Sequence, residues 1–120
     1  AQYCATLHLQ NTVYINGDGE TSRDFCYIDN VVQINILAAT CDTPGKNEVY
    51  NVAVGGQTSL NQLIELIKEN LRQNSFTDIV YKDFRTGDVR HSKASIEKAK
   101  SQLGYDPQYD MRSGLRKLLS

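Results

Sequence analysis

Residues 12–28, TVYINGDGETSRDFCYI, contain two β-rich runs separated by a strong turn signal. The first run, residues 12–16, is rich in β-branched and aromatic side chains and leads directly into Gly17-Asp18-Gly19-Glu20. Residues 22–28 make up a second run of the same kind. Glycine and aspartate between two such runs are typical of a turn, so the sequence predicts two short strands around a Gly-Asp-Gly turn.

Helical and strand patterns alternate along the rest of the chain. Asp29 can cap a helix over residues 30–40, whose apolar side chains recur at helical spacing. Ser59 and Gln62 have the spacing of a capping box, which opens the clearest helix, residues 60–73. The other predicted elements are a short uncapped helix in residues 1–10, strands at residues 48–54 and 78–84, a helix that starts near Ser95 and stops at Gly104, and a last helix capped by Asp110. This alternation predicts a mixed α/β fold.

Length, composition and charge limit the class of protein. The 120 residues have room for one domain, residues 1–120, and a content of 40% hydrophobic and 22% charged residues is that of a globular chain, not a disordered one. A net charge of -1 offers no basic field for a polyanion, so binding to nucleic acid or to a membrane surface is disfavoured. Because no apolar run is long enough for a bilayer and no signal-peptide pattern is visible, we expect a soluble cytoplasmic chain.

Residues for metal or nicotinamide chemistry do not occur in their usual patterns. The three cysteines form no C-x-x-C pair, so we expect buried structural thiols and no metal site. Neither glycine pair, in residues 17–19 or 55–56, fits a dinucleotide-binding turn. No tyrosine is followed four residues later by a lysine. We therefore predict no catalytic, cofactor-binding or metal-binding residue in this chain.

Three polar features can carry a binding function. Arg23-Asp24 lies inside a β-like run, where one side chain can project into a cleft or the two can form an ion pair at a sheet edge. Arg85 and Asp88, in the run R-T-G-D, can converge on one ligand, with the guanidinium on a diphosphate and the carboxylate on vicinal hydroxyls. They can equally belong to an ordinary polar turn. Residues 89–92, VRHS, can form a pocket wall on the same loop.

Taken together and in order, three runs of the sequence resemble one family. Residues 13–39, 49–63 and 83–110 carry the motifs GDG-x-x-x-RDF, YN-x-x-x-GG-x-TS and R-x-GD-x-x-x-S. The combination resembles the C-terminal part of NAD-dependent UDP-hexose 4-epimerases, of the extended short-chain dehydrogenase/reductase family. The likeness is greatest to the bacterial UDP-N-acetylglucosamine 4-epimerases and runs from about residue 12 to residue 119, while residues 1–11 match only loosely.

This resemblance implies a UDP-sugar site. The family's residues around the uracil, the diphosphate and the ribose fall on Tyr14, Ile15, Asn16, Arg23, Phe25, Arg85 and Asp88. The first three match the strand that lines the uracil. Arg23, with Phe25 beside it, and Arg85 are implied to meet the diphosphate, and Asp88 to accept hydrogen bonds from the ribose hydroxyls. Ser92 falls on the wall of the hexose pocket, where a small side chain is similar to the enzymes that admit 2-acetamido sugars.

The same resemblance implies what the chain does not carry. In the family, NAD and the Tyr-x-x-x-Lys catalytic pair belong to an N-terminal Rossmann half, which we expect this chain to lack. We therefore expect a chain without a cofactor of its own that is inactive alone and binds a UDP-sugar weakly. We also expect a homo-oligomer that covers the face left open, while a partner that supplies the Rossmann half remains an alternative. Two other readings stay open: a non-enzymatic module for self-association or UDP-sugar sensing, and a domain that keeps only the scaffold.

Overall fold

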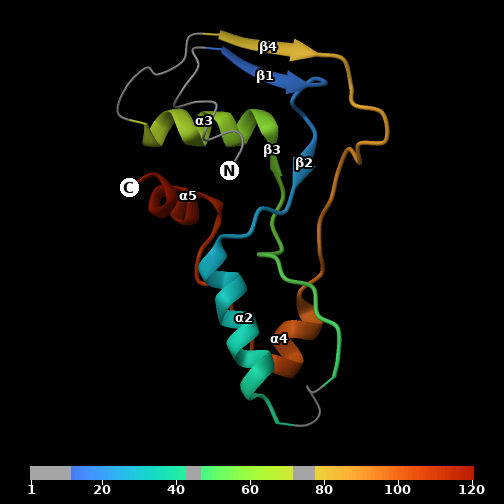
Figure 1. Ribbon diagram of the computed structural model, residues 1–120, viewed down its shortest axis with the longest axis vertical. Helices are drawn as coiled ribbons and strands as arrows, with labels where there is room; N and C mark the ends of the chain where they lie inside the picture. The colour runs from blue at the N-terminus through green and yellow to red at the C-terminus, as the bar shows by residue number, and fades with distance from the viewer. Residues whose placement is uncertain (1–11, 43–46, 72–77) are drawn as a thin grey trace.

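The computed structural model describes residues 12–42, 47–71 and 78–120. The described residues form four strands and four helices. In chain order they are β1 (Thr12–Asn16), β2 (Ser22–Arg23), α2 (Ile28–Thr40), β3 (Thr58–Ser59), α3 (Leu60–Asn70), β4 (Asp78–Lys82), α4 (Glu97–Leu103) and α5 (Met111–Leu119) (Figure 1). Strands β1 and β4 pair in parallel, and β2 and β3 pair antiparallel. The predicted mixed α/β class is confirmed.

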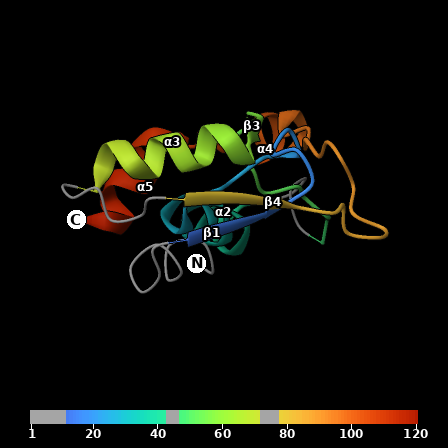
Figure 2. The same ribbon diagram turned by 90° about the horizontal axis from the view of Figure 1, so that it is seen from above.

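The first hydrophobic core lies between the β1–β4 sheet and two helices. Helices α3 and α5 lie on one side of this sheet (Figure 2). Alternation along β1 turns Val13 and Ile15 toward the helices, where both are fully buried, and leaves Tyr14 exposed. We call this cluster the sheet core; its buried members are Val13, Ile15, Leu63, Ile64, Ile67 and Leu115.

Helix α3 begins where the sequence predicts it to begin. The Ser59 side chain accepts a hydrogen bond from the Gln62 backbone N–H, and the Gln62 side chain accepts one from the Ser59 N–H. This reciprocal pair satisfies two backbone donors that the first helical turn would otherwise leave open. The capping box is confirmed, and it turns Leu63, Ile64 and Ile67 onto the sheet.

A second hydrophobic core holds α2 and α4 together at the other end of the molecule. We call it the helix-pair core; its buried members are Ile34, Ala53, Ile96, Ala99, Leu103 and Tyr105. The Tyr105 hydroxyl donates to the backbone oxygen of Ala53 at 2.8 Å, which fixes the irregular segment before β3 against α4. Gly104 adopts the left-handed conformation with φ 67° and ends α4, as the sequence predicts.

One buried asparagine connects the two ends of the molecule. Asn30, in the first turn of α2, is 1% exposed. Its Oδ1 accepts hydrogen bonds from the backbone N–H groups of Gln108 and Tyr109, and its Nδ2 donates to the Tyr109 oxygen at 2.7 Å. The segment that leads into α5 is therefore attached to α2 by three hydrogen bonds from a single side chain.

Several predicted boundaries are wrong, and Asp24 explains two of them. The predicted strand 22–28 pairs only at Ser22 and Arg23, because the Asp24 carboxylate then accepts from the backbone N–H groups of Val54 and Gly55. The same bonds hold the predicted strand 48–54 as an irregular segment that pairs with no strand among the described residues.

The other differences concern helix and strand ends. Helix α2 begins at Ile28 with Tyr27 at its N-cap, so Asp29 lies inside the first turn and does not cap it. Helix α3 ends at Asn70, β4 ends at Lys82, and α4 begins at Glu97. The two-residue strand β3 was not predicted, and the predicted helix in residues 1–10 lies outside the described residues.

Candidate functional site

The loop after β4 carries three of the predicted site residues. Every residue from 83 to 92 is exposed, so the loop adds nothing to either core. A turn brings the N–H of Asp88 within 3.2 Å of the Arg85 oxygen, and Gly87, with φ 80°, allows this turn. The turn places the Arg85 and Asp88 backbones next to each other, as the R-x-G-D spacing suggests.

Arg23 and Asp88 meet although they are 65 positions apart in the sequence. An Nη2 of Arg23 donates to Asp88 Oδ1 at 2.6 Å, and Nη1 donates to the Ser22 oxygen at 2.8 Å. Both side chains are partly exposed, at 30% and 39%. The ion pair between the neighbours Arg23 and Asp24, left open by the sequence, is not formed, because Asp24 binds backbone amides.

Backbone hydrogen bonds attach the end of the loop to β2. The Ser22 N–H donates to the Arg90 oxygen at 2.8 Å, and the Ser92 N–H donates to the Ser22 oxygen at 3.1 Å. The Ser22 hydroxyl and His91 Nδ1 are 2.8 Å apart and share a hydrogen bond. We call this the Ser22 seam. It brings Ser92 to the side of the strand that carries Arg23.

Arg90 binds to the turn between β1 and β2. Its Nη2 donates to Asp18 Oδ2 at 2.6 Å, and its guanidinium carbon lies 5.4 Å from the centre of the Phe84 ring. The Arg90 guanidinium, with a lesser contribution from the Glu20 N–H, holds the pKa of the Asp18 carboxyl below its ordinary value. Of the three arginines on this surface, Arg23 and Arg90 are thus bound to carboxylates, whereas Arg85 has no side-chain partner among the described residues.

The remaining predicted residues point in different directions. Tyr14 lies on the outer face of the sheet, with the Lys82 ammonium 3.9 Å from its ring centre. The Ile15 side chain is fully buried in the sheet core, so any ligand contact from Ile15 must come from its backbone. Asn16 is half-buried at the end of β1. Phe25 is partly buried and packs against the sheet core.

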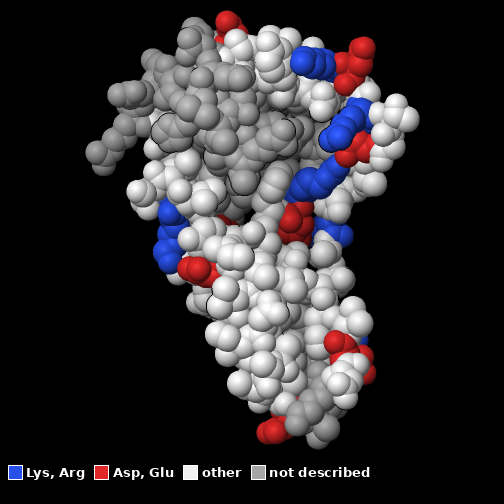
Figure 3. All heavy atoms as spheres, viewed as in Figure 1, with Lys and Arg blue, Asp and Glu red and all other residues white. Residues whose placement is uncertain are grey.

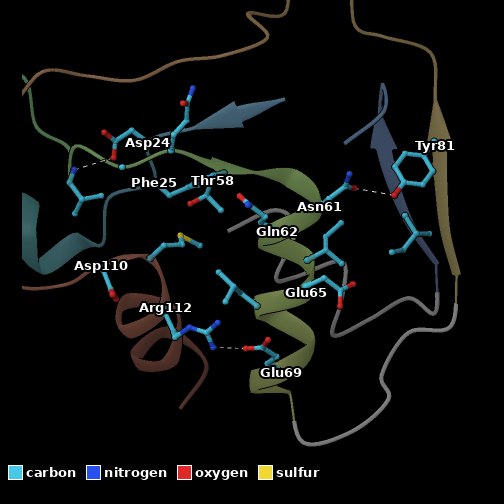
Figure 4. Close-up of a pocket in the computed structure, with 17 residues that line it drawn as sticks. Asp24, Phe25, Thr58, Asn61, Gln62, Glu65, Glu69, Tyr81, Asp110 and Arg112 are labelled. Atoms are coloured by element: carbon cyan, nitrogen blue, oxygen red, sulfur yellow. Dashed lines mark hydrogen bonds and ion pairs between the residues drawn. The ribbon is translucent and has the colours of Figure 1, made fainter. Parts of the chain in front are cut away.

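A cavity of about 770 Å³ lies between α3, α5 and the segment around β3 (Figure 4). Phe25 is on its wall, together with the outer face of α3 and the start of α5. Its acidic side chains already have partners: Glu69 binds Arg112, Glu65 binds Lys68, and Asp110 caps α5. Because the lining has four carboxylates and one guanidinium, this cavity does not favour a diphosphate. Sequence reasoning missed it, although polar residues at helical spacing on α3 indicate its wall.

The described residues do not fit a metal ion or a dinucleotide. No group of three or more metal-ligating side chains occurs among them. NAD needs a glycine turn between a strand and the N-terminus of a helix, but the 17–19 turn connects β1 to β2, and Gly55-Gly56 is separated from α3 by β3. No helix of this part of the chain is long and apolar enough to cross a membrane.

Comparisons with known proteins agree with this fold. The sheet, its helices and the loop after β4 make up a mixed α/β fold, and residues 2–118 match the model of the GDP-mannose 4,6 dehydratase family. The chain therefore belongs to this family of NAD-dependent sugar-nucleotide epimerases and dehydratases. A putative UDP-glucose 4-epimerase of Methanocaldococcus jannaschii is 33% identical over 106 residues, which are 88% of this chain and 32% of that protein.

Solved structures give the same result. The UDP-glucose 4-epimerase of Thermotoga maritima, solved with UDP-glucose, is 37% identical with a TM-score of 0.86, over 98% of this chain and 37% of that one. A UDP-N-acetylglucosamine 4-epimerase of Methanobrevibacter ruminantium, solved with UDP-N-acetylmuramic acid, is 37% identical with a TM-score of 0.79, over 90% and 33%. The chain thus spans about a third of the length of the relatives it matches.

Proposed function

We propose that this chain forms the UDP-sugar-binding portion of an NAD-dependent UDP-hexose 4-epimerase, of the type that acts on UDP-N-acetylglucosamine. The observation that carries the proposal is the contact between Arg23 and Asp88, which joins β2 to the 83–92 loop; the same loop carries Arg85, whose side chain has no partner among the described residues. Two guanidinium groups and a carboxylate on one surface suit a ligand that has both a diphosphate and vicinal hydroxyls.

Each polar group has a distinct part in this proposal. Among the described residues no carboxylate binds the Arg85 side chain, so Arg85 is the arginine that can bind the diphosphate at the lowest cost. Arg23 keeps N–H groups beyond those bonded to Asp88 and to the Ser22 and Arg90 oxygens, and Asp88 keeps Oδ2 for the ribose hydroxyls. The uracil lies along β1, where Tyr14 and Asn16 offer side chains and Ile15 offers its backbone. Phe25 attaches the segment after Arg23 to the sheet core, and Ser92 borders the hexose.

The chain binds and orients the substrate but does not carry out the reaction alone. NAD, bound elsewhere in the full enzyme, supplies the hydride acceptor. With no tyrosine–lysine pair in the sequence to move the proton of the C4 hydroxyl, the chain has no base for this step. Purified chain with NAD and UDP-N-acetylglucosamine should yield no UDP-N-acetylgalactosamine. Product above that of a boiled-protein blank would disprove this part of the proposal.

Titration with UDP, followed by NMR chemical shifts, tests the site. We expect binding near the millimolar range, about 4 kcal/mol, because an open surface leaves the charged contacts screened by water and salt. Shifts should concentrate in residues 14–25 and 85–92. Arg85→Ala should abolish them, while Arg116→Ala, which removes an exposed arginine from α5, should not. The absence of shifts in both segments at saturating UDP would refute the site.

A second property follows from the exposed face of α2, where we propose self-association. Ile28, Val32 and Ile36 follow one another at helical spacing and are 60%, 48% and 59% exposed. Figure 3 shows few charged side chains over this half of the molecule, in contrast to the alternating charges near the 83–92 loop. In a solution of the purified chain, a second copy of the chain is the partner that can cover this face of α2.

Light scattering at tens of micromolar, the range in which standard interfaces are filled, tests the self-association. We expect a dimer or larger species, which Val32→Lys should dissociate with little change in stability. Gln57→Lys, at an exposed position away from α2, is the matched control. A monomeric wild-type chain would contradict self-association. Association without any shift in the UDP titration would favour a non-enzymatic self-associating module, whereas shifts from a chain that stays monomeric would fit a UDP-sugar sensor.

A further inference from the structure

The 83–92 loop is not held in its conformation by hydrophobic burial. Its large apolar side chains, Phe84 and Val89, are 57% and 60% exposed. A loop without buried apolar groups is normally among the first parts of a protein to open. This loop nevertheless has to hold Arg85 and Asp88 in one arrangement if both are to meet the same ligand.

Arg90 attaches the loop to the rest of the protein through both its side chain and its backbone. Its guanidinium binds Asp18 and lies over the Phe84 ring, and its backbone oxygen accepts from the Ser22 N–H. The Phe84 ring in turn occupies the space where a Cβ on Gly17 would lie, so only glycine allows this close approach. We call Gly17, Asp18, Phe84 and Arg90 the Arg90 clasp.

The turn that Arg90 binds is itself fixed to a helix. Asn61, in the first turn of α3, donates from its side chain to the Asp18 oxygen at 3.2 Å, and its backbone N–H donates to the Gly19 oxygen at 3.0 Å. Helix α3 belongs to the sheet core and begins with a capping box. Asn61 therefore holds the turn at Asp18 against α3, and Arg90 holds the loop against that turn.

We propose that Arg90 is a positioning residue of the UDP site: through the Arg90 clasp it holds the loop so that Arg85 and Asp88 face Arg23, and it does not bind the ligand itself. The proposal rests on the proposed function. Its basis is that the Arg90 guanidinium is already bound by a carboxylate and covered on one side by an aromatic ring, whereas the Arg85 guanidinium is free of side-chain partners among the described residues.

Two substitutions separate positioning from a direct effect of charge. Arg90→Met removes a positive charge, and Asp18→Asn removes a negative charge while it keeps an oxygen for the Glu20 N–H. If Arg90 attracts the diphosphate by its charge, Asp18→Asn strengthens UDP binding. If the clasp positions the loop, both variants weaken it, each by about three- to fivefold in Kd, the size expected for an exposed ion pair. The double variant should then bind no more weakly than either single one.

The controls make the assay specific to the loop. Arg112→Met removes an arginine of similar exposure from an ion pair with Glu69 on α3, and it should leave the Kd for UDP unchanged. Amide hydrogen exchange at Ser22 and Ser92 gives a second measurement that does not depend on UDP. Both amides belong to the Ser22 seam, and they should exchange at least about threefold faster in Arg90→Met and Asp18→Asn, but not in Arg112→Met.

Each outcome decides the matter. Tighter UDP binding by Asp18→Asn, or unchanged binding by both variants, overturns the positioning role while the proposed function stands. If wild-type chain binds no UDP, the proposed function fails, and unchanged exchange at Ser22 and Ser92 would then overturn the positioning of the loop as well. Weaker binding and faster exchange in both variants, with Arg112→Met like wild type, supports the proposal.

Discussion

The sheet core and the helix-pair core differ in how much of the apolar surface of their helices they bury. Helix α3 turns Leu63, Ile64 and Ile67 into the sheet core and leaves mostly polar side chains outside. Helix α2 is the more apolar of the two, with Asp29 as its one charged residue, but it buries only Asn30 and Ile34 completely. Helix α3 thus buries its apolar side chains in one core, while most of the apolar surface of α2 is left partly or fully exposed.

The overall dimensions agree with this difference. The structure measures 52 × 34 × 17 Å with a radius of gyration of 16.7 Å, compared with about 14 Å expected for a compact domain of this length. An extended slab keeps its two cores separate and exposes more of each. Mutations in one core, in the other, or in the connection between them should therefore have different effects on stability.

Removal of buried methyl groups should give the largest effects. Ile64→Ala in the sheet core should lower the free energy of unfolding by about 3–4 kcal/mol, since the cavity it leaves is enclosed by strand and helix. Ile34→Ala in the helix-pair core should cost about 2–3 kcal/mol, because its neighbours on α2 are exposed and can collapse into the space. Urea denaturation of both variants measures the difference, and a larger cost for Ile34→Ala would reverse our ranking of the two cores.

Breaking the connection should come next. Asn30→Ala leaves three backbone groups around Gln108 and Tyr109 without a partner, so we expect a cost of about 2–3 kcal/mol. The matched control is Asn35→Ala on the same helix, whose exposed side chain makes one bond to the Val31 oxygen and should cost less than about 0.5 kcal/mol. Equal costs in thermal or urea unfolding would mean that Asn30 does not couple the cores.

The smallest expected effect concerns the start of α5. Asp110 accepts from the Ser113 side chain and N–H, and these bonds lower the pKa of its carboxyl below the ordinary 3.8. Because the pKa of this carboxyl is lower in the folded state than in the unfolded state, its ionisation stabilises the folded state at pH values above the unfolded pKa. This contribution is lost as the pH falls through the folded-state pKa. Asp110→Ala should cost about 1 kcal/mol at pH 7. The gap to wild type should close below about pH 4; a gap that persists in strong acid would exclude the ionised cap.

Local signals in the sequence predicted the elements whose causes are local. Ser59 with Gln62, Asp110 and Gly104 each act within one helical turn, so their spacing is sufficient to place α3, the start of α5 and the end of α4. Asp29 was wrongly predicted as the cap. The residue with the extended conformation of an N-cap is Tyr27, and the helix begins at the next residue, Ile28.

Long-range contacts explain what the sequence did not reveal. The partner of Arg23 is Asp88 and not the adjacent Asp24, and no local pattern distinguishes these two carboxylates. The motif resemblance put Arg23 and Asp88 into one site, but the bond between Arg90 and Asp18 required the folded loop. The cavity between α3 and α5 is likewise made by segments distant in sequence, each of which looks like an ordinary polar surface.

The parallel pairing of β1 and β4 has a consequence for the order of folding. Thr12 is opposite Asp78 and Asn16 opposite Lys82, so the sheet closes only after the intervening chain has been brought together. Closure of so long a loop costs entropy before any ladder bond forms, which delays such contacts relative to local ones. Helix α3, with its own cap, should acquire amide protection early during refolding, and β1 should acquire it last. A polypeptide that is interrupted before residue 78 would then expose Val13 and Ile15, the most buried side chains of its first strand, to aggregation.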